Sequence, residues 1–352
     1  MSTKQLLKKV ADRTTEQKYR DTDMNYYIWD WQNGVGMYGL IKTYEATGDK
    51  RYLQFVKEWV DYHIDKGLPK KTINTVIPFT SVLELYKATG HEPYRWICED
   101  AADFCMCRAK RANEGALEHT VLATEFDSQI WADTLFMGAI FLARWGKFIG
   151  DDMYIYEAIR QLLLHYKYLV DPSNGLMFHA YNCNLRNHMS AVHWGRANGW
   201  AVLSSVEILD MIPNYIKEKD SIIENLNNQV RALLKYCSEN GMWHTVLDCP
   251  ETYLEATISA AMYCGMYRGI RSGYLSKDLA EPCTKVFEGL VRNITPDGLV
   301  MNTSGGTPVM DSAEAYNNIP CVMSYYGQGL TMMALSASLK RENEHIFGYS
   351  DN

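Results

Sequence analysis

The chain alternates between two kinds of helical segment, which differ in how their polar residues are spaced. In one kind, apolar residues recur at i, i+3 and i+4 with charged residues between them, which predicts helices with one wet face. This kind covers 52–64, 155–169 and 222–236, with a further helix expected near 279–291. The other kind is nearly uncharged and rich in small residues, which predicts helices buried on every side. It covers 34–47, 133–147, 199–212, 254–267 and 321–339.

A short repeated motif lies where one helix is expected to end and the next to begin. It occurs at 44–52 and 86–94, with a weaker copy at 148–154, and in each copy a glycine precedes a tyrosine by four positions. This spacing is expected if the glycine caps one helix and the tyrosine opens the next. Strand signals are few, and we expect short strands only at 176–179 and 242–246.

Six buried and about six amphipathic helices predict an all-α fold, a six-hairpin (α/α) double-layered barrel. Such a closed arrangement is expected because each hairpin buries only part of its apolar surface until its neighbours pack against it. A chain of 352 residues is long enough for two domains. No Pro-, Gly- or Ser-rich linker interrupts it, so the sequence predicts a single catalytic domain spanning residues 1–352.

Composition narrows the class of partner. The chain has 35 basic and 42 acidic residues, a net charge of −7, which argues against nucleic-acid binding. An anionic small substrate remains compatible, because a local basic cluster can override the global charge. No apolar run is long enough to span a membrane, and residues 1–20 lack the apolar core of a signal peptide, so no membrane association is expected.

The cysteines indicate a reducing compartment. There are nine, an odd number, scattered through a chain large enough to fold without disulfides. That usage predicts free thiols and a cytoplasmic location. Cys105 and Cys107 form a C-x-C pair without a matching second half, so neither a metal site nor a cofactor is expected.

Asp133 is the most informative residue for chemistry. It opens a stretch without another charge until Arg144, so its carboxylate is expected to lose hydration on burial. Burial raises the pKa of a carboxyl group towards the range where it can donate a proton near neutrality, which makes Asp133 a candidate general acid. The alternative is a structural aspartate that caps the helix.

The loops that enter the inner helices of such a barrel line one cavity. Those loops are expected to contribute Trp29, Asp30, Trp31, Gln32, Asn33, Asn74, Thr75, Asp127, Gln129, Trp131, Asp133, the segment 193–200, Glu255, Tyr325 and Tyr326. Tryptophan and tyrosine rings stack on sugars, which suits a concave carbohydrate site. For any single tryptophan, core packing explains the residue equally well.

Three further polar side chains are candidates for the cavity. Arg196, in the uncharged context Trp-Gly-Arg-Ala-Asn-Gly-Trp, offers a planar fork for a carboxylate. Its alternative is a structural ion pair with Asp133 or Glu255. His179 and His193 are candidate substrate contacts, although a loop histidine is more often an ordinary hydrogen-bonding residue.

Four motifs, in order, resemble those of a known enzyme family. They are Trp131-Ala-Asp-Thr-Leu-Phe-Met137, Gly175-Leu-Met-Phe-His179, His193-Trp-Gly-Arg-Ala-Asn-Gly-Trp200 and Tyr253-Leu-Glu-Ala-Thr257. They are similar to the unsaturated rhamnogalacturonyl hydrolases, glycoside hydrolases of family 105, which are related to the unsaturated glucuronyl hydrolases of family 88. The resemblance runs from about Trp29 to the last inner helix and implies the same six-hairpin barrel.

The resemblance also implies a reaction. These enzymes hydrate the double bond of the 4,5-unsaturated uronic acid that lyases leave at the non-reducing end of oligosaccharides. By this resemblance Asp133 protonates carbon 4 and then takes a proton from the water that adds at carbon 5. The resemblance places the unsaturated uronate against four side chains: His179, Trp194, Arg196 and Trp200. Asn74, Trp131 and His193 complete the expected substrate-binding set.

Two departures from the family pattern bear on this expectation. Many members have an aspartate where the motif places Asn74. An amide cannot serve as a second acid, so Asp133 is expected to be the acid. The segment between His179 and Trp194 is also shorter than in many relatives. Because it borders the site, the sugar next to the uronate stays open.

Several hypotheses therefore remain. The leading one is a cytoplasmic hydrolase, a monomer or weak homodimer, that acts on a small pectin-derived oligosaccharide and releases the unsaturated uronate from rhamnose. A second is the same chemistry on a glycosaminoglycan or ulvan fragment. A sugar epimerase, which would depend on its histidines, and a non-catalytic sugar-binding barrel are the alternatives from other classes.

Overall fold

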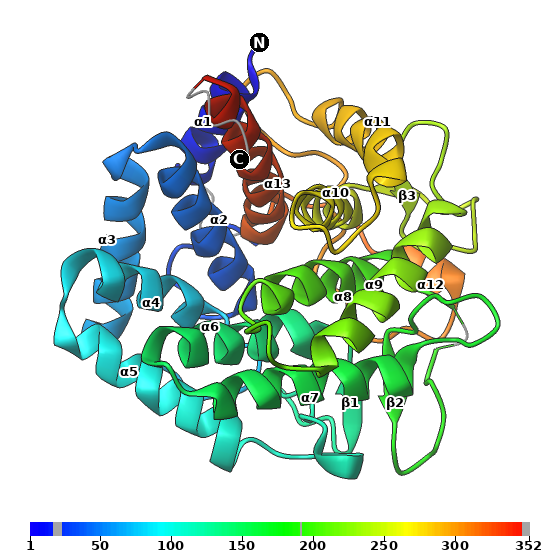
Figure 1. Ribbon diagram of the computed structural model, residues 1–352, viewed down its shortest axis with the longest axis horizontal. Coiled ribbons are helices and arrows are strands. Elements are labelled where there is room, and N and C mark those ends of the chain that lie inside the picture. The colour runs from blue at the N-terminus through cyan, green and yellow to red at the C-terminus, as the bar shows by residue number, and fades with distance from the viewer. Residues whose placement is uncertain (17–22, 191, 347–352) are drawn as a thin grey trace.

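The computed structural model describes residues 1–16, 23–190 and 192–346, with side chains described to residue 339. Two concentric layers of helices confirm the expected barrel (Figure 1). The inner helices are α2 (Trp31–Thr47), α4 (Pro78–Thr89), α6 (Ile140–Ile149), α8 (Gly195–Leu209), α10 (Ala256–Arg271) and α13 (Tyr325–Ile346). The outer helices are α1 (Thr3–Thr14), α3 (Lys50–Lys66), α5 (Glu92–Asp103), α7 (Asp152–Leu169), α9 (Glu218–Leu234) and α11 (Ala280–Val291).

The ends of the chain close the barrel. The last inner helix, α13, packs against the first, α2, and the N-terminal helix α1 packs on α13 as the outer helix of the sixth hairpin. The sequence pattern did not predict α1, yet Leu6, Leu7, Val10 and Ala11 are buried on one of its faces. Glycines allow α2 and α13 to approach closely: a Cβ on Gly39 would lie 2.6 Å from the Cα of Gly329.

The repeated glycines cap inner helices, as the sequence predicts. Gly48, Gly90 and Gly150 adopt left-handed φ values of 70°, 66° and 74°, and each follows the last residue of α2, α4 or α6. A Cβ at these positions would meet no atom within 4 Å, so the positive φ, and not crowding, is what favours glycine.

The short strand expected around 176–179 is present in part. Met177 forms an isolated antiparallel bridge with Val170, and the regular strand β2 (Ala180–Asn182) follows and pairs antiparallel with β1 (Gln129–Trp131). The backbone N–H groups of residues 177 and 178 donate to a side chain of α8 and to the end of α7. The helix expected at 133–147 begins at residue 133, and it contains a π-helical turn, η3 (Leu135–Ala139), before α6 that the sequence pattern did not predict. The strand expected at 242–246 is present in short form, as β3 (Trp243–His244) paired with β4 (Leu254–Glu255).

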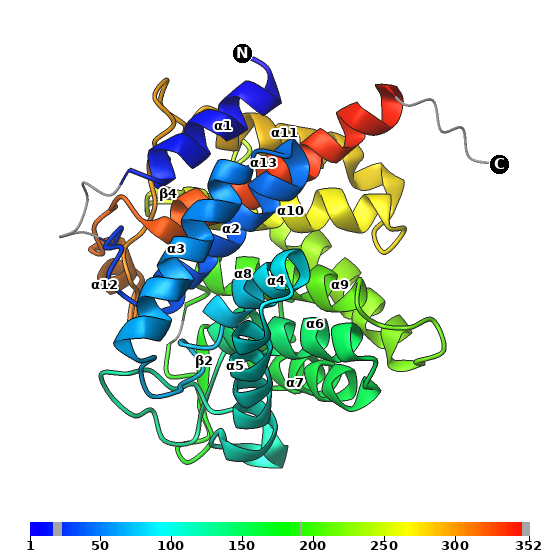
Figure 2. The ribbon, with the colours of Figure 1, turned by 90° about the vertical axis from the view of Figure 1, so that its left-hand side faces the viewer.

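The remaining short elements lie in connecting loops. They are the π-helical turn η1 (Phe104–Arg108), the 3-10 turns η2 (Asn113–Gly115) and η4 (Lys277–Leu279), and the short helix α12 (Ala313–Asn317). Strands β2 and β4 and helix α12 gather at the end of the barrel where the inner helices begin (Figure 2). We call this end the site face.

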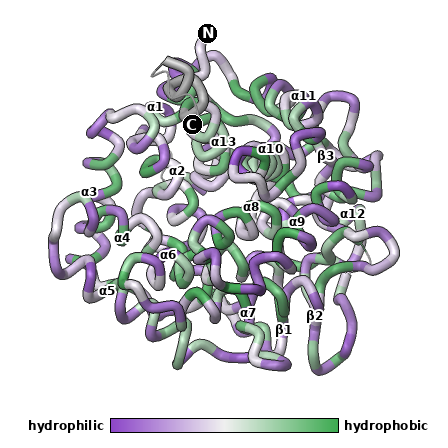
Figure 3. Tube along the Cα trace, in the orientation of Figure 1, coloured by the Kyte–Doolittle hydropathy of each residue, from purple (hydrophilic) through white to green (hydrophobic). Residues whose placement is uncertain are grey.

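The core lies between and inside the two layers. Hydrophobic positions follow the central helices, whereas hydrophilic positions concentrate on the outer helices and loops (Figure 3). Among the described residues, no helix is both long and apolar enough to cross a membrane.

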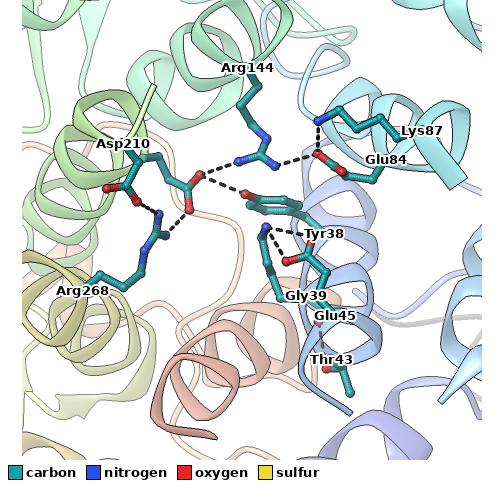
Figure 4. Close-up of polar contacts among 11 residues, drawn as sticks. Tyr38, Gly39, Thr43, Glu45, Glu84, Lys87, Arg144, Asp210 and Arg268 are labelled. Atoms are coloured by element: carbon teal, nitrogen blue, oxygen red, sulfur yellow. Dashed lines mark hydrogen bonds and ion pairs between the residues drawn. The ribbon is translucent and has the colours of Figure 1, made fainter. Parts of the chain in front are cut away.

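A buried charge network ties five inner helices together near their C-terminal ends, away from the site face (Figure 4). At its centre the carboxylate of Glu207, 1% exposed, accepts hydrogen bonds from Tyr38 and Arg144 (2.9 and 3.2 Å) and from Arg268. Arg144 also binds Glu84 at 2.7 Å. Although burial by itself would raise it, Arg268 and Arg144 hold the pKa of Glu207 well below its usual range.

Candidate active site

Strand pairing brings the two motifs with the strongest chemical signal together at the site face. Trp131 is paired with Ala180, and the backbone N–H of Ala132 donates to the carbonyl oxygen of His179 at 3.0 Å. Asp133 follows directly after β1, and its Oδ2 lies 3.2 Å from Nε2 of His179. The contact was not readable from the sequence, because the two residues are separated by α6 and α7.

Asp133 carries an unused hydrogen-bonding atom. Its side chain is 16% exposed, and its buried Oδ2 makes no aligned hydrogen bond to any described residue. His179 is fully buried, and its Nε2 likewise lacks an aligned partner. The π-helical turn η3 begins two residues later, and such turns are common at functional sites. The N-cap residue of this turn is Thr134, and no side-chain hydrogen bond caps the turn.

The electrostatic state of Asp133 corrects one expectation. Burial raises the pKa of this carboxyl group, but the adjacent His179 and, more weakly, His119 and Arg196 lower it by more. Its net pKa therefore lies below the usual range, and the raised pKa expected from the sequence is wrong. Asp133 is thus a carboxylate at neutral pH.

Aromatic rings pack against His119 and His179, the two histidines that lower the pKa of this carboxyl group. Trp131 stacks on His119 with ring centroids 4.6 Å apart and an angle of 11°, and Trp194 packs on His179 at 4.1 Å. His119 was not predicted as a site residue. Its Nδ1 lies 3.0 Å from Oγ1 of Thr134, and burial lowers its pKa to about 4, so it is neutral at physiological pH.

Arg196 is buried, and its guanidinium group binds the loop at residues 304–307. Nη1 donates to the carbonyl of Ser304 at 2.8 Å, and Nη2 donates to the carbonyl of Gly305 and to Oγ1 of Thr307, both at 2.9 Å. Glu255 lies 3.9 Å from Nη1, consistent with the structural ion-pair alternative. In this conformation a substrate carboxylate would have to share or replace these bonds.

The guanidinium of Arg196 also lies among aromatic rings. It sits 4.5 Å from the ring centroid of Trp194 and 5.1 Å from that of Tyr326. Its positive charge lies among these rings, where it lowers the pKa of both Asp133 and His179.

His193 is not brought together with Asp133. Its Nδ1 lies 2.7 Å from Asp248 and its Nε2 3.3 Å from Asp171, while its ring packs on Phe178 at 4.4 Å. Both ring nitrogens thus face carboxylates that come from two other loops. This geometry favours the ordinary hydrogen-bonding role that the sequence left open.

The other two expected substrate contacts differ in their setting. Asn74 is 7% exposed; its backbone N–H donates to Thr120, which directly follows His119, and its side-chain amide bonds to no described residue. Trp200 is fully buried within α8, and its ring packs on Phe136 at 4.7 Å. Asn74 is therefore free to meet a ligand, whereas the Trp200 ring is packed on Phe136, and its buried Nε1 has no hydrogen-bond partner among the described residues.

Tyr316 is a second residue that sequence reasoning missed. It is fully buried on α12, and its hydroxyl lies 2.8 Å from Nδ1 of His179. Its sequence surroundings, Ala313-Glu-Ala-Tyr-Asn317, contain no motif that would have marked it. In the part of the chain that the structure describes, no group of three or more His, Cys, Asp and Glu side chains is arranged to hold a metal ion.

A six-hairpin helical barrel with a carboxylate set among tryptophan, histidine and arginine at its mouth is the architecture of a carbohydrate-active enzyme. Comparison with known families identifies which one. The model of Glycosyl Hydrolase Family 88 matches residues 3–342, and the chain belongs to this family. It is a glycoside hydrolase, which excludes the epimerase and the non-catalytic barrel among the hypotheses above.

Individual relatives agree with this assignment. The chain is 36% identical over 319 residues to the unsaturated rhamnogalacturonyl hydrolase YesR of Bacillus subtilis, covering 89% of this chain and 90% of that protein. The crystal structure of a possible member of glycoside hydrolase family 105 from Salmonella enterica superposes with a TM-score of 0.92 at 30% identity, covering 97% and 94% of the two chains. The unsaturated glucuronyl hydrolase of Bacillus sp. GL1 shares the fold, with a TM-score of 0.73 at 17% identity over 95% and 96% of the two chains.

Proposed function

We propose that this enzyme removes a 4,5-unsaturated uronic acid from the non-reducing end of lyase-generated oligosaccharides by hydrating its vinyl ether double bond. The observation that carries the proposal is the Oδ2 atom of Asp133. It is buried, has no aligned hydrogen-bond partner among the described residues, and lies 3.2 Å from Nε2 of His179, whose ring is packed against Trp131 and Trp194. A carboxyl group placed there can exchange a proton with a flat, unsaturated ring.

The chemistry needs one group that can both give and take a proton. Asp133 delivers a proton to carbon 4, and the developing positive charge at carbon 5 is shared with the ring oxygen. Water then adds at carbon 5 and returns a proton to Asp133. The resulting hemiketal opens, which leaves a hemiacetal at carbon 1 that expels the neighbouring sugar. The pair of carboxylates that ordinary glycosidases use is not required.

The remaining site residues hold the uronate. Trp131 and Trp194 are buried against His119 and His179 and hold those rings beside the sugar, and the side-chain amide of Asn74 bonds to a hydroxyl. Arg196 supplies positive charge towards the uronate carboxylate while it keeps the 304–307 loop in place. Trp200 and His193 act indirectly, Trp200 by packing on Phe136 and His193 by joining the loops that carry Asp171 and Asp248.

We take rhamnose as the neighbouring sugar, because of the likeness to the unsaturated rhamnogalacturonyl hydrolase YesR over most of both chains. The competing substrates are unsaturated glucuronyl disaccharides from glycosaminoglycan or ulvan. Parallel kinetics on these disaccharides, followed by the loss of ultraviolet absorbance from the conjugated double bond, rank them. A higher kcat/KM on a glucuronyl disaccharide would overturn the rhamnose assignment without touching the reaction type.

Asp133→Asn tests the mechanism, because it keeps the shape of the side chain but removes the transferable proton. We expect kcat to fall by about 10²–10⁴ or more, since the group acts twice. Asp278→Asn, an exposed aspartate at the opposite end of the barrel, is the control and should leave kcat unchanged. In deuterated water the wild-type product should carry one solvent deuterium at carbon 4. Release of the sugar with the double bond intact, or an active and folded Asp133→Asn, would contradict the mechanism.

We also place the enzyme in the cytoplasm as a monomer or weak homodimer. Support for the location comes from the nine cysteines, all of which are free thiols, two of them exposed. Fractionation of cells that produce the protein, and sedimentation over a range of protein concentrations, test the location and the oligomeric state.

A further inference from the structure

Tyr316 stands directly behind the histidine that faces Asp133. It lies on α12, in the loop between α11 and α13, and its side chain is fully buried. Its hydroxyl lies 2.8 Å from Nδ1 of His179, and its ring is nearly parallel to that of Trp194, at 6.0 Å and 20°. A chain of contacts therefore runs from Tyr316 through His179 to Asp133.

The proton on His179 can occupy either ring nitrogen. Burial lowers the pKa of His179 and raises that of Tyr316, so at neutral pH the imidazole is neutral with one N–H and the phenol keeps its proton. If the ring proton were on Nδ1, Nε2 would carry a lone pair 3.2 Å from a carboxylate oxygen, and the two would repel each other. If it is on Nε2, Tyr316 donates to Nδ1 and the Nε2–H faces Asp133.

We propose that Tyr316 is a positioning residue for the hydration reaction, because its hydroxyl donates to Nδ1 of His179 and thereby keeps the imidazole proton on Nε2, facing Asp133. The inference rests on the proposed function. As Asp133 gives its proton to carbon 4, the Nε2–H is in place to donate to the carboxylate that forms, and the bond need only become aligned in the complex.

The loop that carries Tyr316 is held by the same motif that builds the site. Arg196 binds the carbonyl groups of Ser304 and Gly305, which precede α12 in this loop. At its far end, the side chain of Asn317 accepts a hydrogen bond from the backbone N–H of Tyr253 at 2.9 Å. Both anchors restrict the position of α12, so the Tyr316 hydroxyl is supported as a fixed donor.

Tyr316→Phe tests the proposal by removing one hydroxyl and keeping the ring. Tyr263→Phe is a matched control, since Tyr263 is 4% exposed and makes a single hydrogen bond of the same length, 2.8 Å, to Ser338 away from the site face. We expect Tyr316→Phe to lower kcat by about 10- to 100-fold and to change KM much less, while the control changes neither. An effect of Tyr316→Phe on KM alone, or no effect, would overturn the proposal.

Nitrogen-15 NMR of the imidazoles gives a readout that needs no substrate. The His179 signals, assigned by their loss in a His179→Asn protein, should show the Nε2–H tautomer in the wild type and a mixture in Tyr316→Phe. A wild-type Nδ1–H tautomer would overturn the proposal even if the variant does not fold. Because this measurement is independent of turnover, it separates failure of the positioning role from failure of the proposed reaction.

The pH–rate profile adds a third measurement. Besides Tyr316, the groups that face His179 are Asp133, Arg196 and His119. All of them are unchanged in Tyr316→Phe. A shift of the profile in this variant, absent from Tyr263→Phe, is therefore expected if the hydroxyl acts through the His179–Asp133 pair. Identical profiles in the variant and the wild type would contradict it.

Discussion

At the scale of single residues, the proposed role of Asp133 as a general acid conflicts with its lowered pKa. A general acid needs a proton, yet the surroundings of Asp133 hold the pKa of its carboxyl group below the usual range. The substrate resolves this conflict in the proposed reaction, because its carboxylate is attached to carbon 5, next to the carbon that Asp133 protonates. A like charge so close raises the pKa of a carboxyl group. Substrate binding itself is therefore expected to protonate Asp133.

Proton uptake on binding tests this idea. A saturated uronyl-rhamnose disaccharide has the carboxylate but no double bond to hydrate, so its binding can be measured by calorimetry in buffers of different ionisation enthalpy. At a pH between the pKa of Asp133 in the free enzyme and its raised pKa in the complex, we expect binding to take up as much as about one proton. Asp133→Asn should take up none. Equal uptake by both proteins would show that another group, such as His179, takes the proton.

At the scale of helices, the buried charges of Glu207, Arg144 and Arg268 connect neighbours that would otherwise be held by apolar contacts alone. A buried carboxylate that loses its charge leaves its cationic partners without compensation. This role belongs to the packing of the inner layer and not to the reaction, because the network lies near the C-terminal ends of the inner helices.

Glu207→Gln measures what the network contributes. We expect the free energy of unfolding to fall by about 3–5 kcal/mol at pH 7 in urea titrations followed by circular dichroism. Glu281→Gln, an exposed glutamate on α11, is the control and should change little. Because the folded-state pKa of Glu207 is lowered, its contribution is complete above the unfolded pKa of about 4.3 and is lost as the pH falls towards the folded value. A loss below about 1 kcal/mol at pH 7 would mean that the charges are not needed.

At the scale of the whole molecule, the two ends of the chain depend on each other. Helix α13 packs between α2 and α10, and α1 covers α13, so the first and last hairpins complete one layer. A fragment that contains only some hairpins exposes the faces that its absent neighbours would cover.

This dependence predicts a single cooperative unfolding transition for the intact chain. Truncation after Gly150, which caps the third inner helix, should leave an insoluble fragment, because it keeps two complete hairpins but separates α1 from α13 and α6 from α7. The measurements are coincident unfolding curves from near- and far-ultraviolet circular dichroism, and the solubility of the fragment. An independently folded, soluble half would contradict the single-domain prediction.

The sequence by itself determined the architecture and predicted a candidate site around Asp133. Hydrophobic periodicity separated inner from outer helices, and the glycines at 48, 90 and 150 marked their ends, because helix burial and left-handed caps are local properties of the chain. The charge-free surroundings of Asp133 and the four motifs also pointed to the family, which the comparisons confirmed.

The tertiary structure decided how those residues act. His119 and Tyr316 lie at the candidate site but come from segments that carry no recognisable motif. The ring nitrogens of His193 face two carboxylates from other loops. The pKa of Asp133 has a direction opposite to the one expected from burial alone, since it depends on a histidine 46 positions away in the sequence that strand pairing places 3.2 Å from it. The periodicity of apolar residues shows which face of a helix is buried. The pKa of a side chain depends on its distances to charged groups, and only the closed barrel fixes those distances.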